Sequence, residues 1–440
     1  MNETTPWARQ ATPVAAVAAL LAALVGAPAQ AQSQGSDPAG AAAAASASPY
    51  YLGASQGLSH DSNVYRIPSG PGDYYSSTSL LAGFDQPISR QRVFGTASAS
   101  LNRYRNETAL NNTSYDLAAG LDWQTLYNLS GSVNATLGQR LAAPTASVAA
   151  PQAHRNLAQR QGVSGVARWG GVSLFTLEGT LGYSALDYSA PEYVGSESKQ
   201  EYGGLALYYR QSPLLRLGVA ARLDRARTPQ AFLQPDGSYL PNQINGRHLD
   251  FLADYELSGR LNANGKISYT KQTNSSAGGA DFSGITGDLG LTYRPTGKLV
   301  LSAYAARQAG FDTSLGATPV VPGGTTPATT PTAGLYENNR VTNSFRLGAT
   351  YAATAKINVT GGLNYARARL VSTLATPTGS VGSPDVVDET QAYTLGVSYA
   401  IARPWLLACN LGHEKRDVSG GVSFAYEATS VGCSAQFTWR

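Results

Sequence analysis

Hydrophobic and polar residues alternate with a period of two along most of the chain. Leu129, Val133 and Leu137 are separated by serine, asparagine and threonine, and the segments 393–401 and 430–439 repeat the pattern. Successive side chains of a β-strand point to opposite faces, so this period gives each strand one apolar and one polar face. The pattern therefore predicts a chain built from many strands of this kind.

Taken run by run, the alternation predicts about eighteen strands, an even number as in bacterial outer-membrane barrels. The predicted strands are 50–59, 75–85, 92–104, 113–125, 128–140, 160–169, 172–186, 200–210, 214–226, 247–257, 260–272, 281–294, 298–309, 340–353, 356–368, 390–401, 404–414 and 428–439.

The connections between these strands alternate between short and long. The short connections include 170–171, 211–213, 258–259, 295–297 and 402–404. The long connections include 141–159, 228–246, 310–339 and 371–389. Bacterial barrels place short turns and both termini in the periplasm and long loops outside the cell. The order of connections favours this topology.

Composition separates the remaining fold classes. Charged residues make up 14% of the chain, which holds 47 Gly and 25 Tyr, and beyond the N-terminal segment no run reaches the roughly 18 apolar residues of a membrane helix. A soluble sandwich would carry more charge on its polar faces. We therefore expect an all-β fold, a single antiparallel transmembrane β-barrel over residues 50–440, in the outer membrane of a Gram-negative bacterium.

The N-terminal segment has the features of an export signal. A short apolar run from Val14 to Gly26 follows Arg9 and precedes small residues, which predicts a signal peptide over residues 1–31. Cleavage after Ala29 and after Ala31 are equally consistent with it. Residues 32–49 are expected to form a flexible periplasmic lead-in.

Tryptophan and cysteine provide two further checks on the strand assignment. Tryptophan prefers the boundary between membrane and water, and the assignment places four at the periplasmic rim: Trp123, Trp169, Trp405 and Trp439. A last hairpin turning about residues 420–421 would place Cys409 opposite Cys433, within reach of a disulfide in the oxidising periplasm. The alternative is two free thiols on the lipid face.

Candidate catalytic and metal-binding groups are few. His60, Asp61 and Ser62 are adjacent at a loop mouth, without a recognisable oxyanion partner, and are better explained as loop residues. The other histidines, His154, His248 and His413, lack the spacing of metal ligands. We therefore expect no enzyme activity, no metal, no cofactor and no nucleic-acid partner.

Strand parity directs many charged and aromatic side chains into the lumen. The candidates for contact with a polymer are Arg168, Arg210, Arg216, Arg222, Arg294, Arg346, Tyr202, Tyr208 and Tyr304. The predicted lumen acids are Asp116, Asp122, Glu178, Asp250, Asp254, Glu256 and Asp288. Arginine–carboxylate pairs that stiffen the wall would explain this set. A track for a sugar polymer and the transverse field of a porin are the alternatives.

The opening segment "YLGASQGLSHDSNVYR" (51–66), the Tyr-rich strands and the closing "GCSAQFTWR" (432–440) resemble a known family. They look like the EpsL-type barrels of exopolysaccharide-biosynthesis operons, within the β-barrel porin 2 group. The resemblance implies an exopolysaccharide exporter that works with periplasmic export and inner-membrane polymerisation proteins. It also implies a lipid bilayer and the outer-membrane insertion machinery as partners, although Arg440 follows the terminal aromatic Trp439.

Three functions follow as hypotheses. Export of an exopolysaccharide is the first, and it implies that polymer is trapped or unmade when the protein is lost. A passive porin for small nutrients is the second, with high conductance as its signature. A structural or adhesive barrel is the third. Five residues, 191–195, also resemble a porin constriction-loop element, but they fall in the fourth long loop and chance explains them better.

Overall fold

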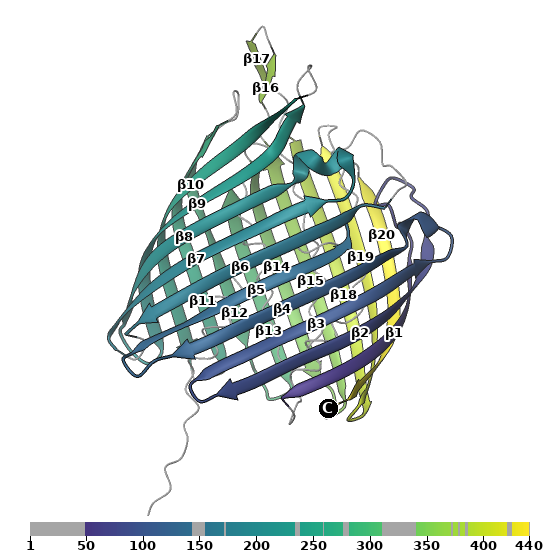
Figure 1. The fold of residues 1–440 in the computed structure, drawn as a ribbon, viewed down its shortest axis with the longest axis horizontal. Helices are drawn as coiled ribbons and strands as arrows, with labels where there is room; N and C mark the ends of the chain where they lie inside the picture. The colour runs from purple at the N-terminus through teal and green to yellow at the C-terminus, as the bar shows by residue number, and fades with distance from the viewer. Residues whose placement is uncertain are drawn as a thin grey trace, which may run out of the picture.

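The computed structural model shows one closed antiparallel sheet of eighteen strands (Figure 1). It describes residues 49–142, 155–170, 173–233, 238–257, 259–275, 281–309, 340–370, 373–376, 379–382, 386–419 and 425–439. The sheet closes where the last strand, β20 (Tyr426–Trp439), pairs with the first, β1 (Tyr50–Asp61). The predicted all-β barrel is confirmed, whereas the expected signal peptide and nearly all of the lead-in lie outside the described residues.

Each predicted strand corresponds to one strand of the barrel. The others are β2 (Asp73–Ile88), β3 (Gln91–Tyr104), β4 (Asn112–Gln124), β5 (Leu129–Leu141), β6 (Leu157–Trp169), β7 (Phe175–Tyr188), β8 (Ser198–Arg210), β9 (Leu215–Leu233), β10 (Tyr239–Leu257), β11 (Leu261–Asn274), β12 (Phe282–Tyr293), β13 (Leu299–Ala309), β14 (Arg340–Ala352), β15 (Ile357–Leu370), β18 (Val386–Ala402) and β19 (Trp405–Ser419). Outside the barrel wall lie a small hairpin, β16 (Thr373–Thr376) with β17 (Gly379–Gly382), and two 3-10 helices, η1 (Thr108–Leu110) and η2 (Pro191–Ser196).

The connections at the two ends of the barrel differ in length. Short connections such as 89–90 and 403–404 lie at the end where the chain terminates, at the bottom of Figure 1.

The predicted long loop 228–246 is wrong, because β9 and β10 continue upward as a hairpin whose described residues end at 233 and resume at 238. The hairpin contains Pro229 and Pro241, each without an N–H for the ladder, and the pairing register shifts between Leu240 and Asn242.

The two faces of the wall have opposite polarity. Leu80 and Leu181 on the outer face are 66% and 70% exposed, whereas Glu178 and Asn112 on the inner face are almost fully buried. This is the reverse of a soluble protein and suits a wall between lipid and an aqueous lumen. Eighteen strands about 4.8 Å apart and tilted by about 40° give a barrel about 36 Å across, backbone to backbone.

The four tryptophans beyond the N-terminal segment lie beside short connections or the chain end. Trp123 precedes the turn 125–128, Trp169 precedes 170–174, and Trp405 follows 403–404. Trp405 packs edge-on against Phe437, with ring centroids 5.1 Å apart. Aromatic side chains at this level fit an interfacial girdle. Among the described residues, no helix is long and apolar enough to cross a membrane.

Candidate functional site

The inner faces of β8, β9 and β10 carry two similar clusters of tyrosine, arginine and aspartate. The lower cluster lies nearer the short turns. In it, the Arg216 guanidinium donates hydrogen bonds to Asp254 at 2.7 and 2.9 Å. Its Cζ also lies 4.1 Å from the ring centroid of Tyr208. The stacking and the charge-assisted hydrogen bonds together fix the guanidinium against the wall.

The upper cluster repeats the same residue types six positions away on β8 and β9 and four positions away on β10. Tyr202 lies on β8, Arg222 on β9 and Asp250 on β10, with Arg222 Nε 3.6 Å from Asp250 Oδ2. At about 3.4 Å per residue, the two levels are separated by about 20 Å along the strands. Because the strands are tilted by about 40°, this separation is about 15 Å along the barrel axis, so the wall presents a polar strip across about half of the apolar band.

Glycines on neighbouring strands allow the two tyrosine rings to lie against the wall. Gly182 of β7 is paired with Tyr202, and Gly218 of β9 is paired with Tyr208. A Cβ atom added at either glycine would overlap the ring, at 2.6 Å in the case of Gly218. The tyrosines thus fill the space that the missing side chains leave, as aromatic residues do opposite glycine in other sheets.

Most other charged groups of the lumen wall are also paired across strands. One deeply buried pair is Arg168 on β6 with Glu178 on β7, with 2.6 Å between Nε and Oε2 and side chains 9% and 1% exposed. Further pairs are Arg92 with Asp122, Arg140 with Asp116, Lys266 with Asp288, and Arg416 with Asp388. The interleaved charges produce the cross-strand pairing that parity predicted for this wall.

The remaining candidates lie elsewhere on the wall or at its rim. Arg346 of β14 lies over the ring of Tyr304 on β13, with Cζ 5.4 Å from the centroid. Arg210 ends β8 opposite Arg216 at the lower rim. Arg294 follows the end of β12 and is exposed in the turn 294–298, outside the strand predicted to contain it. It therefore does not belong to the strip on β8–β10.

One buried residue of the lumen wall, His248, was not predicted to belong to it. His248 of β10 is hydrogen-bonded to Asp224 of β9, and its Nδ1 lies 3.0 Å from the Thr270 hydroxyl. Thr270 in turn lies 2.7 Å from Thr286, so the chain of contacts crosses β9 to β12. These four residues all occupy even-numbered, inward-facing positions. Strand parity could therefore have predicted that they lie together on the inner face.

The adjacent His60, Asp61 and Ser62 do not converge on one site. His60 packs against Tyr74 on the outer face, Asp61 contacts Arg66, and the Ser62 hydroxyl accepts a hydrogen bond from the Thr429 N–H. No group of histidine, cysteine and carboxylate side chains suited to a metal ion occurs in the described part of the chain.

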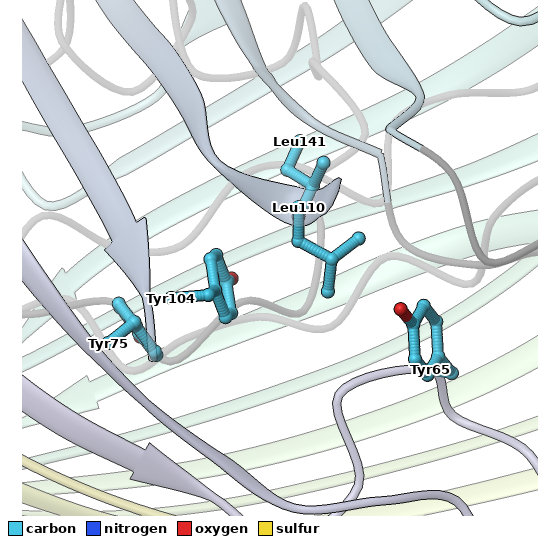
Figure 2. Close-up of a cluster of buried hydrophobic side chains, with 5 residues drawn as sticks. All are labelled: Tyr65, Tyr75, Tyr104, Leu110 and Leu141. Atoms are coloured by element: carbon cyan, nitrogen blue, oxygen red, sulfur yellow. The ribbon is translucent and has the colours of Figure 1, made fainter. Parts of the chain in front are cut away.

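The connection 62–72, here called the mouth loop, folds into the upper end of the barrel. Figure 2 shows Tyr65 of this loop facing Tyr75, Tyr104, Leu110 and Leu141, with which it forms a buried apolar cluster. The Tyr65 hydroxyl donates to Glu107 at 2.7 Å. Burial, together with this hydrogen bond, raises the pKa of the Tyr65 hydroxyl.

Charge fixes the other side of the mouth loop. The Arg66 guanidinium lies 2.8 Å from Asp61 and 3.5 Å from Glu414, and all three side chains are at most 10% exposed. The loop therefore joins β1 to β19 and narrows the upper entrance on that side. A second connection at this end, between β7 and β8, contains the 3-10 helix η2.

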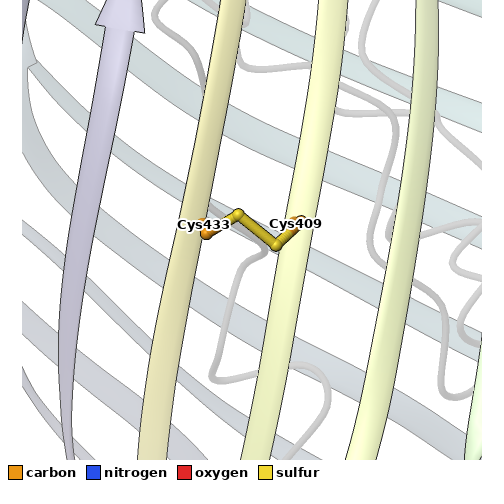
Figure 3. The surroundings of a disulfide bond; sticks show 2 residues. All are labelled: Cys409 and Cys433. Atoms are coloured by element: carbon orange, nitrogen blue, oxygen red, sulfur yellow. A yellow bond between two sulfur atoms is a disulfide. The ribbon is translucent and has the colours of Figure 1, made fainter.

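The outer face carries one covalent cross-link. Cys409 of β19 is paired in register with Cys433 of β20, as the hairpin arithmetic predicts, and the two form a disulfide across the strands (Figure 3). Both residues occupy outward, exposed positions beside Val397 and Leu58 of the flanking strands. The cross-link thus lies on the lipid face, away from the lumen.

This chain is similar to several solved outer-membrane proteins at low sequence identity. OpdK from Pseudomonas aeruginosa, solved with vanillate, is 12% identical over 89% of this chain and 99% of its own, with a TM-score of 0.45. OccK2 (OpdF) from the same organism is 10% identical over 88% and 97%, TM-score 0.45. The siderophore receptor PiuA from Acinetobacter baumannii is 9% identical over 89% and 82%, TM-score 0.45. These likenesses concern the fold alone.

No family model and no curated protein matches the chain. Its eighteen strands, apolar outer face and polar inner face are those of an outer-membrane β-barrel of a Gram-negative bacterium.

Proposed function

We propose that the barrel is a passive channel through which small polar solutes cross the outer membrane. The observation that carries the proposal is the paired lumen wall, in which arginine, lysine and carboxylate side chains from neighbouring strands meet on the inner face. Such a wall offers hydrated solutes polar contacts without one strong binding site. Barrels of this strand number leave an aqueous channel wherever loops do not fill it.

Arginine side chains lie over two of the lumen tyrosines, which favours a channel for small solutes over a path along which sugar rings stack. Tyr208 is 4% exposed and lies beneath the Arg216 guanidinium, and Tyr304 is 7% exposed beside Arg346. A sugar ring needs an open aromatic face for stacking, and these two faces are occupied. Tyr202 alone of the three predicted tyrosines keeps partial exposure.

Single-channel recording of the purified full chain in a planar lipid bilayer tests the proposal. The wild type should insert in discrete steps of ionic current. In the variant R216Q/R222Q the carboxylates of Asp254 and Asp250 lose their counter-charges, so the reversal potential in a salt gradient should move toward cation selectivity. The matched control is R225Q, which removes a cation from the outer face of the same strand and should leave the reversal potential unchanged.

Two results would overturn the channel proposal. One is wild-type protein that is folded and inserted but carries no current. The other is a reversal potential that R216Q/R222Q and R225Q change equally, because the lumen strip would then have no special role in permeation.

Export of an exopolysaccharide is the second candidate, and the resemblance of residues 51–66 and 432–440 together with the partly exposed Tyr202 favours it. It would require periplasmic export and inner-membrane polymerisation proteins as partners. A strain lacking the gene distinguishes the two functions. Export predicts periplasmic retention of polymer with normal uptake of small solutes, and the channel predicts slower uptake with normal polymer release.

A further inference from the structure

The upper outer face of β8 to β11 carries a group of exposed cations, which we call the outer basic patch. All point away from the lumen and lie in the halves of the strands remote from the short turns. Its members are Lys199, Arg225, Arg227, Arg247 and Lys271. Glu201 is the one carboxylate on an outward position of these four strands, where it is paired in register with Arg225 without forming an ion pair, and Glu197 of the preceding loop lies beside Lys199.

Like charges face each other directly within the patch. Lys199 is paired in register with Arg227, and Arg247 with Lys271. Directly opposed like charges on adjacent strands destabilise a sheet unless an opposite charge lies between them. Among the residues that the structure describes, none of the five patch cations forms an ion pair, in contrast to the paired cations of the lumen wall.

The outer face becomes apolar beside and below the patch, where Leu223 is paired in register with Arg247. Leu205, Leu223 and Leu249 are 64%, 62% and 50% exposed, and Tyr269 is 57% exposed. Leu223 and Arg225 are two residues apart on β9, about 7 Å along the strand. A molecule that lies along this face would therefore place an anionic group on the patch and apolar chains on the leucines.

We propose that the outer basic patch binds the phosphate groups of a phosphorylated glycolipid in the outer leaflet of the membrane. The patch lies at the extracellular end of the barrel, because both chain termini and the short turns belong at the periplasmic end. Phosphate oxygens lying between the opposed cations relieve their repulsion through charge-assisted hydrogen bonds. The acyl chains of the same lipid cover the exposed leucines below.

The site is independent of the proposed channel, because every member faces outward. Substitution of the patch cations should therefore leave the conductance and the reversal potential of the barrel unchanged. A soluble polyanion or a second copy of the chain would use the charges without the leucines beneath them, and the choice of lipid probes separates these occupants.

The test is native mass spectrometry of the full chain in detergent, titrated with lipid A that carries two phosphates and with the same lipid after removal of the phosphates. The variant R225Q/R247Q/K271Q removes three patch charges. The matched control R260Q/K298Q/K356Q removes three cations from the short turns at the opposite end. Each basic side chain near an anionic surface strengthens binding about fivefold, so the triple patch variant should bind on the order of a hundredfold more weakly.

Wild type and the control variant should both retain the bisphosphorylated lipid, and neither should retain the dephosphorylated one. Equal binding of the two lipids would overturn the proposal, because the leucines alone would then explain retention. Equal loss in the patch and control variants would overturn it as well, since total charge rather than the patch would then be responsible. Dimers that dissociate only in the patch variant would replace the lipid with a second copy of the chain.

Discussion

The buried pair of Arg168 and Glu178 allows a sharp test of what stabilises the barrel. Arg168 Nε lies 2.6 Å from Glu178 Oε2, and the two side chains are 9% and 1% exposed. With charge centres about 4 Å apart and an effective dielectric constant of about 20, the attraction is about 4 kcal/mol. Glu178→Gln would leave the guanidinium buried without its counter-charge, at a cost of about 3 to 5 kcal/mol in the free energy of unfolding.

Replacing both partners should cost far less than replacing one. Arg168→Met combined with Glu178→Leu removes both charges and fills the space with apolar groups, and such exchanges are often close to neutral. The exposed pair of Arg92 and Asp85, 48% and 53% exposed, supplies the control. Arg92→Gln should change stability by no more than about 1 kcal/mol.

Urea titration of the barrel folded in lipid vesicles, followed by tryptophan fluorescence, measures these differences. Trp169 follows Arg168 directly and reports on this part of the wall. The reasoning fails if Glu178→Gln costs no more than Arg92→Gln. It also fails if the double variant is as unstable as the single one, because the loss would then reflect shape rather than an unpaired charge.

Three further predictions concern the disulfide, the mouth loop and pH. Alkylation followed by mass spectrometry should label Cys409 and Cys433 only after reduction, and C409A/C433A should lower stability by up to about 3 kcal/mol, as expected for a cross-link that spans 24 residues. Labelling without reduction would contradict the first part. Arg66→Ala removes the contacts to Asp61 and Glu414, so protease should cleave the loop 62–72 faster and single-channel conductance should rise, whereas unchanged values would show that the apolar cluster alone holds the loop. Burial raises the pKa of the Glu197 carboxyl, so folding favours its protonated form. The stability it contributes is greatest below its ordinary pKa and falls as pH rises, and Glu197→Gln should flatten urea midpoints measured between about pH 4 and 7.

The strand pattern could be predicted from sequence because lipid and water impose it residue by residue. Outward positions in the membrane-embedded part of a strand must suit lipid, so Leu205 and Leu207 of β8 alternate with inward residues and reveal the face of each neighbour. Register at Cys409 and Cys433 followed from hairpin arithmetic, because the position of a connection between antiparallel strands determines which residues face each other.

Parity could direct a side chain inward but could not say what it meets there. Tyr208 was a candidate platform for sugar rings, yet its face lies under Arg216, and the glycine that seats it is on the next strand. The folding of the mouth loop was also beyond prediction. Its contacts join Arg66 to Glu414, which are 348 positions apart in the numbering, and no local pattern carries such a contact.

The same residue types serve opposite purposes on the two faces of β9, and their partners explain why. Arg216 and Arg222 face the lumen, where carboxylates of β10 neutralise them and hold them in place. Arg225 and Arg227, further along the same strand, face outward and form no ion pair with a described residue. On the outer face of β8 to β11, Glu201 is the one strand carboxylate against five cations, so the net charge of this surface attracts an anionic membrane surface. The inner face thus brings its own counter-charges, and the outer face is arranged to receive them from the membrane.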